Sequence, residues 1–441
     1  MAGAASSTFM RNWFRYEIIP IYAVTVVAVT GGAWYLTRLA RGPEVVWDQK
    51  NNPTPWNNIQ EGTQVKLMAV NQKFDKNYNL ILSRLMISGI FNEPVTKYTG
   101  DKCRIIEGPE ACEDIVIHQK TGLAFMACGN EYERKTQWYP PANVYKNYSY
   151  LPHDTPYVYN IKTDTLTPLT LKNFDEGLLL HGIGIYEDPA EPNELYLFLI
   201  NHKKSGSVIE LFKHTLNTFE LNYVKTFKHE LIYNPNDVAP VSKDEFYVTN
   251  DYYNTHWLWK YVEGFAGLPW GFVVFHSDKT NTTEIVIDRL AYPNGIITNW
   301  DYSKVYVGTI NTGELLIYER KPNNKLELLD RVSAGNFVDN VNLDPITGDL
   351  YLGVGVNGFE NALYNLKDEI DPLRRPGFRV IKVSNNTAED RYYGVKYKKE
   401  TVIEDDGSFY HSLSVAAVDS ERKVMLLGSP NARGVVRCEL D

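Results

Sequence analysis

The sequence predicts an all-β protein, a six-bladed β-propeller preceded by a single transmembrane helix. Three observations support this: a two-strand unit repeated six times, 30 Tyr, 18 Phe and 9 Trp residues that favour strands, and an uncharged apolar run near the start. With 44% hydrophobic and 22% charged residues, the composition excludes disorder. We therefore divide the chain into a membrane-anchor module (1–78), a linker (79–100) and a propeller domain (101–441).

The predicted transmembrane helix covers about 18–37, IIPIYAVTVVAVTGGAWYLT, which contains no charged residue. About 20 apolar residues in a helix span a hydrocarbon core of about 30 Å. Arginines flank the run equally on both sides, so their count predicts no orientation. A secretory signal would have a shorter apolar region and a small-residue cleavage site. A membrane anchor is therefore favoured over a cleaved signal or a buried helix.

The segment that follows, RLARGPEVVWDQKNNPTPWN, resembles the MLRQ-type small subunit of the mitochondrial respiratory chain. The resemblance covers roughly 13–75, and its specific residues are Trp47, Asp48, Asn51, Asn52, Pro53, Pro55 and Trp56. It implies an inner-membrane location and an association with the respiratory chain. The prolines of this segment exclude a helix or a central strand, and they predict an extended connector. In the linker, LILSRLMISGIF is compatible with a short amphipathic helix.

The repeated unit is a polar residue that opens a short alternating strand, a turn, and a second strand rich in aromatic and β-branched residues. The opening residues are Glu113, His181, Asn236, Asn294, Asp339 and His411, separated by 68, 55, 58, 45 and 72 positions. Such spacing accommodates four short strands with their loops. One four-stranded sheet cannot bury both of its faces, whereas six sheets packed radially can. A β-sandwich lacks such a unit, and β-helix repeats are much shorter.

Charge and cysteine content restrict the partners and the compartment. The net charge of −9 argues against a surface that tracks phosphates, so we expect no nucleic-acid partner. Cys103 lies in the first propeller strand and Cys438 in the last, which predicts a ring-closing disulfide if these strands share a blade; two buried thiols are the alternative. Cys112 and Cys128 are expected to be packing residues. A disulfide requires an oxidising compartment.

Three glycosylation sequons begin at Asn147, Asn281 and Asn385, and they are compatible with a glycoprotein on the secretory route. The expected location is therefore a membrane, in one of two places. The propeller either faces the intermembrane space from the mitochondrial inner membrane, or lies in the secretory pathway or at the cell surface.

In a propeller, residues at the starts of the innermost strands converge on the central channel. Five of them offer a hard oxygen ligand: Glu113, Asn236, Asn294, Asp339 and Asn340. Carboxylate and amide oxygens without Cys or His at the same positions select Ca²⁺, which accepts 6–8 of them. The alternative for each single residue is that it caps a turn.

From about residue 101 the chain resembles the paraoxonase/arylesterase family of calcium-dependent propeller hydrolases. The matching strings include EDIVI at Glu113, HGIGIY at His181, NDV at Asn236, PNGI at Pro293 and VDNVNLDPITGDLYLG from Val338. The resemblance implies two calcium ions. The catalytic ion would be held by the five oxygen-bearing residues, and a structural ion by the side chains of Asp114 and Asp237 and the carbonyl of Ile183.

The resemblance also implies that His181 and His202 form the general base. Whether Asp339 takes a more direct part in activating the water is left open. Asp251 is a candidate acid behind the ligands. His411 is a channel-facing candidate that does not map onto the family pattern, and Gly355 stands near where members often carry a histidine.

The implied activity is hydrolysis of small-molecule aryl esters or lactones, with organophosphate triesters as a promiscuous extra. The main alternative is a non-catalytic, membrane-anchored interaction or assembly module with structural calcium. Propellers that resemble strictosidine synthase and lack the calcium ligands are a further alternative.

Overall fold

The computed structural model describes most of the propeller region and parts of the N-terminal region. The described residues are 19–42, 45–48, 50, 53–55, 63–64, 76–77, 89, 102–139, 144–147, 149–358, 360–361, 364, 375–388 and 395–440. The chain divides into two compact units, Met1–Ser83 and Arg84–Asp441. Except for Gly89, the predicted linker helix lies outside the described residues.

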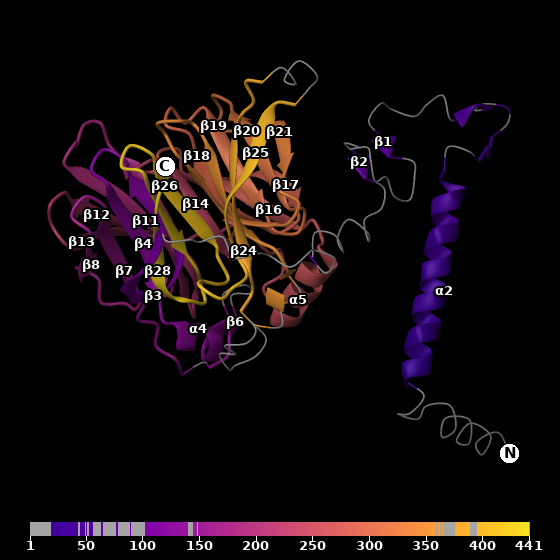
Figure 1. Cartoon of the computed structure of the whole chain (residues 1–441), viewed down its shortest axis with the longest axis horizontal. Coiled ribbons are helices and arrows are strands. Elements are labelled where there is room, and N and C mark those ends of the chain that lie inside the picture. The colour runs from indigo at the N-terminus through magenta and orange to yellow at the C-terminus, as the bar shows by residue number, and fades with distance from the viewer. Residues whose placement is uncertain are drawn as a thin grey trace. The chain divides into compact units, whose positions relative to one another are not determined.

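The first unit contains the helix predicted from the apolar run. This helix, α2, covers Ile19–Ala40 (Figure 1), and the unit also contains a short parallel pair, β1 (Thr63–Gln64) and β2 (Lys76–Asn77). Trp47 donates a hydrogen bond from its indole nitrogen to the carbonyl of Ala40, 2.5 Å away, at the end of α2. Within the part of the chain that the structure describes, no helix combines the length and hydropathy needed to cross a membrane.

The second unit is all-β, with strands arranged in repeated antiparallel sheets. Three sheets have four strands each. They are formed by β14 (Pro235–Ser242), β15 (Glu245–Asn250), β16 (Gly271–Ser277) and β17 (Thr282–Leu290); by β18 (Pro293–Thr298), β19 (Lys304–Thr309), β20 (Glu314–Arg320) and β21 (Leu326–Ser333); and by β22 (Phe337–Leu343), β23 (Leu350–Gly355), β24 (Phe378–Asn385) and β25 (Tyr397–Asp405).

A fourth sheet has the same antiparallel order with one parallel strand added at its edge. It contains β10 (Leu180–Glu187), β11 (Glu194–Lys203), β12 (Gly206–Thr215) and β13 (Glu220–Phe227), followed by β9 (Thr170–Lys172). Seven further strands form one continuous sheet of two blades. Its order is β26 (Val415–Asp419), β27 (Val424–Gly428), β28 (Arg433–Glu439), β3 (Cys103–His118), β4 (Leu123–Gly129), β7 (Thr155–Asn160) and β8 (Thr165–Pro168).

Strand β3 joins the last blade to the first. Its first half pairs with β28, with Cys103 opposite Cys438, and its second half pairs with β4. At the change of partner Ala111 has a φ of 47°, a left-handed conformation that turns the chain between the two blades. The predicted Cys103–Cys438 disulfide is confirmed, with the Cα atoms 4.0 Å apart.

The prediction that Cys112 and Cys128 are only packing residues is wrong, because they form a second disulfide. Cys112 lies on β3 and Cys128 on β4, in an antiparallel hairpin whose register places Glu110 opposite Gly129 and Asp114 opposite Ala127. The two cysteines therefore meet across the hairpin. Both side chains are also fully buried in the apolar cluster between the last and first blades.

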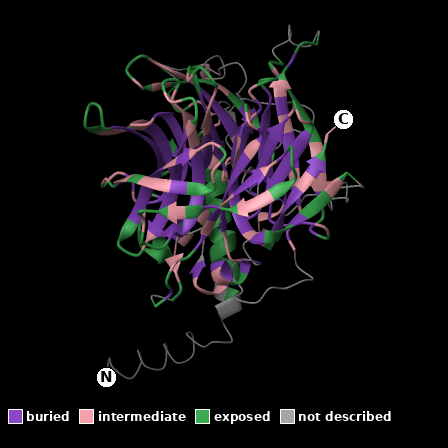
Figure 2. Ribbon diagram, turned by 90° about the vertical axis from the view of Figure 1, so that its left-hand side faces the viewer, coloured by how far each residue is buried: buried purple, intermediate pink, exposed green. Residues whose placement is uncertain are grey.

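The blades close into a ring. The innermost strands β3, β10, β14, β18, β22 and β26 contact one another in succession, and β26 contacts β3. Six apolar clusters of buried side chains lie between neighbouring blades, one at each junction. Figure 2 shows buried strands through the middle of the unit and exposed loops around them. This arrangement is consistent with the predicted six-bladed propeller.

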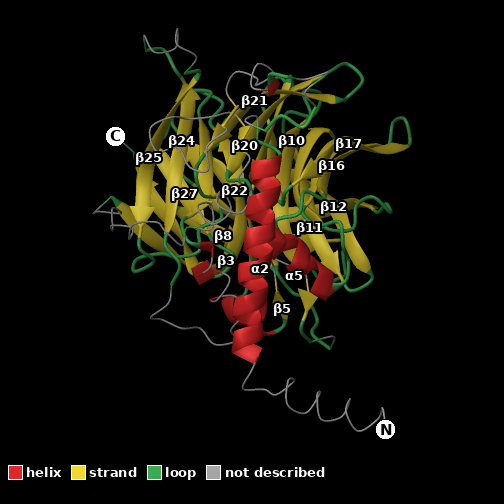
Figure 3. Ribbon diagram, turned by 90° about the vertical axis from the view of Figure 1, so that its right-hand side faces the viewer, coloured by secondary structure: helices red, strands yellow, loops and turns green. Residues whose placement is uncertain are grey.

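Helices α4 and α5 of the second unit lie at the same end of the ring (Figures 1 and 3). Helix α4 (Glu131–Thr136) is capped by Asn130, whose side chain accepts a hydrogen bond from the amide of Glu133, and β5 (Trp138–Tyr139) and β6 (Val144–Tyr145) follow it. Helix α5 (Trp257–Ala266) ends at Gly267, which has a φ of 57°.

Candidate functional site

The candidate site is built from irregularities in the innermost strands. The pairing of these strands with their neighbours shifts between the following residues: Glu110 and Asp114, Leu180 and Ile183, Pro235 and Val238, Pro293 and Ile296, and Val338 and Val341. All five predicted oxygen ligands, and His181, fall inside these shifts. A bulge frees residues from the ladder and re-aims their side chains, so the same local device recurs around the ring.

Four of the five predicted ligands have a buried oxygen without a hydrogen-bond partner. These atoms are Glu113 Oε2, Asn236 Oδ1, Asn294 Oδ1 and Asn340 Oδ1. An unsatisfied buried acceptor costs about 1–3 kcal/mol, so four at equivalent places need a common explanation. Lone pairs of hard oxygens are what a cation such as Ca²⁺ binds, and the set therefore fits a cation.

The amide nitrogens hold these oxygens in place. Asn340 Nδ2 donates to Glu113 Oε1 at 2.9 Å and to the Glu113 carbonyl at 3.1 Å, which leaves Asn340 Oδ1 available. Asn236 Nδ2 lies 3.5 Å from Asp251 Oδ2, so the predicted acid Asp251 lies behind a predicted ligand. Ser414 connects two members, because its hydroxyl donates to the Glu113 carbonyl and its carbonyl accepts from the Asn340 amide.

The charges at the site favour a bound cation. Burial, followed by the neighbouring charges of Asp114, Asp339 and Asp237, raises the pKa of Glu113 well above its ordinary value. Burial, followed by the charge of Asp114, raises the pKa of Asp339 to about 8. Clustered carboxylates repel one another, and a divalent cation would turn that repulsion into attraction.

Asp114 and Asp237 form a second group one residue further along their strands. Asp114 accepts hydrogen bonds from the amides of Ile115 at 2.8 Å and Ile183 at 2.9 Å. Asp237 accepts from the amides of Val238 and Ile296, both at 2.7 Å. Burial raises the pKa of Asp114 to about 6 and, together with Asp114, raises that of Asp237 well above its usual range. Two buried carboxylates that face a common space also fit a cation.

In the described residues, no group of three or more His, Cys, Asp and Glu side chains is arranged to hold a metal ion. The first candidate site contains only two carboxylates, Glu113 and Asp339, and three asparagine amides. Most of the oxygens that this site would offer a cation therefore belong to asparagine amides, and a group of His, Cys, Asp and Glu side chains does not include these.

The predicted histidine pair is formed. His181 Nδ1 lies 2.9 Å from His202 Nε2, and His202 Nδ1 lies 2.8 Å from Ser207 Oγ. On the other side, His181 Nε2 lies 3.8 Å from Glu113 Oε1. Burial lowers the pKa of His181 to about 3 and, together with His181, lowers that of His202 well below its usual value. Both rings are therefore neutral, and each carries one unprotonated ring nitrogen.

Sequence reasoning missed the residues that support this pair. Trp138, fully buried, has its ring centroid 5.1 Å from that of His202 and 6.1 Å from that of His181. Tyr145 donates a hydrogen bond to the His202 carbonyl. Both residues come from the insertion between β4 and β7. Its one signal in the sequence is the long spacing of 68 between the first two opening residues.

The remaining predicted residues lie as follows. His411 is buried, its Nδ1 lies 3.4 Å from Ser412 Oγ, and its ring packs against Tyr364 at 5.4 Å between centroids. Neither of these two contacts involves a predicted ligand. Gly355 ends β23, and Ile183 begins the regular pairing of β10 with β11 after the bulge.

Gly182 is a position at which a side chain would disturb the site. A Cβ there would lie 2.5 Å from Asp237 Oδ1 and 2.6 Å from the Asn236 carbonyl oxygen. We expect Gly182→Ala to lower the free energy of unfolding by about 1–3 kcal/mol and to weaken cation binding. Denaturant unfolding and equilibrium dialysis would measure this. Gly355→Ala is the control, because its Cβ would have 3.8 Å of clearance, and an equal loss there would contradict the explanation.

Comparison with known proteins agrees with both resemblances. Residues 13–65 match the sequence model described as NADH-ubiquinone reductase complex 1 MLRQ subunit. Serum paraoxonase/arylesterase 2 of Rattus norvegicus is 31% identical over 345 residues, 77% of this chain and 88% of that protein. Serum paraoxonase/lactonase 3 of Homo sapiens is 30% identical over 322 residues, 72% of this chain and 84% of that protein.

Among solved structures, a luciferin-regenerating enzyme covers 76% of this chain and 94% of its own, at 12% identity and a TM-score of 0.45, which is too low to bear on the assignment. The Arylesterase sequence model matches residues 95–440. The chain therefore belongs to the arylesterase family.

Proposed function

We propose that the protein is a calcium-dependent hydrolase of carboxylic esters and lactones, with phosphotriesters as a side activity. The observation that carries the proposal is the set of four unsatisfied buried oxygens next to a neutral histidine pair. The family relatives are named for arylesterase and lactonase activities, which agrees with this class of substrate.

The histidine pair would act as the general base. In the tautomers this role requires, His181 Nε2 is the free acceptor on the side of Glu113. His181 Nδ1–H then donates to His202 Nε2, and His202 Nδ1–H donates to Ser207 Oγ. A water held beside Glu113 would pass its proton to His181 Nε2, and the charge that develops would be shared along this chain. Trp138 excludes solvent from the same rings.

Calcium fits the first candidate site because its ligands are all oxygens of moderate charge. When bound, the ion would supply Lewis-acid stabilisation of the negative charge that develops on the substrate oxygen. Glu113, Asn236, Asn294, Asp339 and Asn340 would hold it, and Asp114, Asp237 and Ile183 would hold the second ion. Asp251 would keep the Asn236 amide turned with its oxygen towards the first ion.

We further propose that the N-terminal module places this hydrolase at a membrane. Its match to the MLRQ subunit suggests the mitochondrial inner membrane and an association with the respiratory chain. Fractionation with protease protection would test the location. A glycosidase-sensitive shift in size would instead favour the secretory route.

Turnover of phenyl acetate and a γ-lactone by the full chain tests the activity. We expect hydrolysis that a calcium chelator abolishes and that added calcium restores. A folded protein that binds calcium but hydrolyses neither compound would contradict the proposal and favour the non-catalytic alternative.

Ser207→Ala tests the role of the histidine pair. Loss of the hydroxyl removes the group that orients His202 Nδ1, and we expect kcat to fall about 10–100-fold while calcium affinity and KM change little. Ser277→Ala is the matched control. It removes a buried hydroxyl that donates a hydrogen bond to Glu245, at a position remote in sequence from the histidine pair. Steady-state kinetics measure both variants. A rise in KM without a fall in kcat would contradict a role of Ser207 in the general base.

A further inference from the structure

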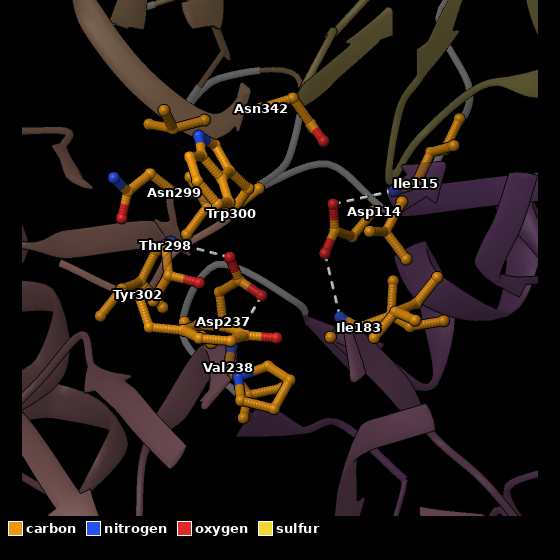
Figure 4. A pocket seen from close by; sticks show the side chains of 18 residues that line it. Asp114, Ile115, Ile183, Asp237, Val238, Thr298, Asn299, Trp300, Tyr302 and Asn342 are labelled. Atoms are coloured by element: carbon orange, nitrogen blue, oxygen red, sulfur yellow. Dashed lines mark hydrogen bonds between the residues drawn. The ribbon is translucent and has the colours of Figure 1, made fainter. Parts of the chain in front are cut away.

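His181 lies at a point of β10 that the regular strand pairing does not hold. The pairing of β10 with β11 shifts between Leu180 and Ile183, so His181 falls inside the bulge. On one side of the bulge, Asp114 Oδ2 accepts a hydrogen bond from the amide of Ile183 at 2.9 Å (Figure 4). The position of His181 therefore also depends on how the chain is anchored on the other side, at Leu180.

Arg134 and Asp154 provide that second anchor. Asp154 Oδ2 accepts a hydrogen bond from the amide of Leu180 at 2.8 Å. Arg134 Nη2 donates to the Leu180 carbonyl at 2.7 Å and to Asp154 Oδ2 at 3.0 Å. That carbonyl belongs to the peptide bond that joins Leu180 to His181, so Arg134 acts directly on the backbone of the histidine.

The guanidinium group of Arg134 also packs against the indole that covers the histidine pair. Arg134 Cζ lies 5.2 Å from the ring centroid of Trp138, which is within the range of a cation–π contact. The centroid of Trp138 in turn lies 5.1 Å from that of His202 and 6.1 Å from that of His181. One side chain thus contacts both the backbone before His181 and the ring that is packed on the pair.

Gly129 provides the space for this arrangement. A Cβ at position 129 would lie 2.6 Å from Arg134 Nε and 2.7 Å from Asp154 Oδ1. The side chains of Arg134 and Asp154 are only 1% and 2% exposed. The ion pair is therefore almost completely buried, and a side chain at position 129 would displace it.

Stability does not explain this ion pair. Among the described residues, Nε and Nη1 of Arg134 have no hydrogen-bond partner, so one guanidinium nitrogen, Nη2, makes all of its bonds. Unsatisfied buried donors destabilise a fold, and replacing a buried ion pair by well-packed apolar residues often costs no stability. The contacts with the backbone of His181 and with Trp138 indicate a role in the site instead.

We propose that Arg134 is a positioning residue of the hydrolase, which fixes the backbone before His181 and the indole of Trp138 and thereby holds the two histidine rings in their hydrogen-bonded geometry. The inference rests on the proposed function. Asp154 is the partner that aims Nη2 at the Leu180 carbonyl. Because this nitrogen is directed at the backbone, Arg134 acts through His181 and Trp138.

Arg134→Met in the full chain tests this role, because methionine keeps much of the apolar length and removes the charge and the donors. We expect kcat for phenyl acetate to fall about 10–100-fold, the scale on which a small displacement of a reacting group lowers a rate. KM and calcium affinity should change little, since no predicted ligand is removed. Steady-state kinetics and equilibrium dialysis measure these quantities.

Arg422→Met is the matched control. Arg422 Nη1 donates to Asp419 Oδ2 at 2.6 Å and to the Gln119 carbonyl at 2.9 Å, and its Nε is also buried without a partner in the described chain. It makes the same kind of ion pair and backbone bond in the turn between β26 and β27. We expect this variant to lose stability without a change in kcat.

Proton NMR gives a readout that does not depend on turnover. One imidazole N–H lies in the 2.9 Å contact between His181 Nδ1 and His202 Nε2, and its resonance is assigned by its loss in His202→Gln. Local opening controls the exchange of such a proton with solvent, so exchange should be about tenfold faster, or more, in Arg134→Met than in the wild type. Arg422→Met should leave it unchanged.

Wild-type kcat and exchange in folded Arg134→Met would overturn the inference, as would equal losses of kcat in Arg134→Met and Arg422→Met. If Arg134→Met does not fold, Arg134→Lys decides. Lysine keeps the charge beside Asp154 but lacks the planar group that stacks on Trp138, so unchanged kcat and exchange in that variant would also overturn the inference. Absence of hydrolysis by the wild type would count against the proposed function, whereas the exchange measurement would still decide whether Arg134 holds the rings.

Discussion

Replacement of Glu113 by glutamine is expected to lower kcat/KM for phenyl acetate by at least about 100-fold, the scale on which one preorganised electrostatic contact contributes to a transition state. The substitution keeps the shape and the hydrogen bond from Asn340 Nδ2, but it removes one of two carboxylates from the first site. Calcium affinity, measured by equilibrium dialysis, should fall with it.

When calcium is absent, Glu113→Gln should lose less stability than the wild type as the pH rises. The pKa values of Glu113 and Asp339 are raised in the fold, the latter to about 8. A raised pKa contributes stability below the unfolded value and loses it as the pH rises through the folded value. The chelated wild type should therefore become less stable between about pH 5 and pH 8, and Glu113→Gln less so.

Glu131→Gln is the matched control for this prediction. Glu131 is also a buried glutamate, but it lies on α4 and pairs with Arg433, 2.9 Å away, outside the candidate site. Thermal unfolding with calcium and with chelator, at several pH values, compares the two variants. Equal losses of activity in both, or wild-type calcium binding in folded Glu113→Gln, would contradict the assignment of the site.

Much of this site could be predicted because its chemistry repeats along the chain. Polar residues at the start of each inner strand stand out from β-branched surroundings, so Asn236, Asn294 and Asp339 could be chosen from position alone. The family resemblance then supplied His202 and the role of His181, and the structure shows the two paired.

The features that could not be predicted depend on contacts made by segments that lie outside the repeated two-strand unit. Trp138 and Tyr145 come from an insertion, and nothing in their own sequence indicates that they cover the histidines. The five bulges were hidden as well, because a bulge changes which neighbour a residue faces without changing the alternation of residue types. The Cys112–Cys128 pair did carry a signal, since both cysteines are nearly equidistant from the turn at 119–122.

The two disulfides are expected to differ in what they stabilise. Cys103–Cys438 closes a separation of 335 residues and Cys112–Cys128 one of 16. In the chain-entropy model, loss of the first costs about 6 kcal/mol and loss of the second about 3 kcal/mol. The double variant Cys103→Ser/Cys438→Ser should therefore show the larger fall in the free energy of unfolding.

The effects of the two disulfides on calcium affinity should be in the reverse order. Loss of Cys112–Cys128 should lower the affinity more than loss of Cys103–Cys438. Cys112 directly precedes Glu113 inside the bulge of β3, whereas Cys103 lies in the half of β3 that pairs with β28. Cys112→Ser/Cys128→Ser should weaken calcium binding in protein that is still folded, because Glu113 loses a covalent anchor beside it. Urea unfolding and equilibrium dialysis of both double variants test the two rankings together. A loss of affinity confined to the Cys103→Ser/Cys438→Ser variant would show that ring closure, rather than the β3–β4 hairpin, positions Glu113.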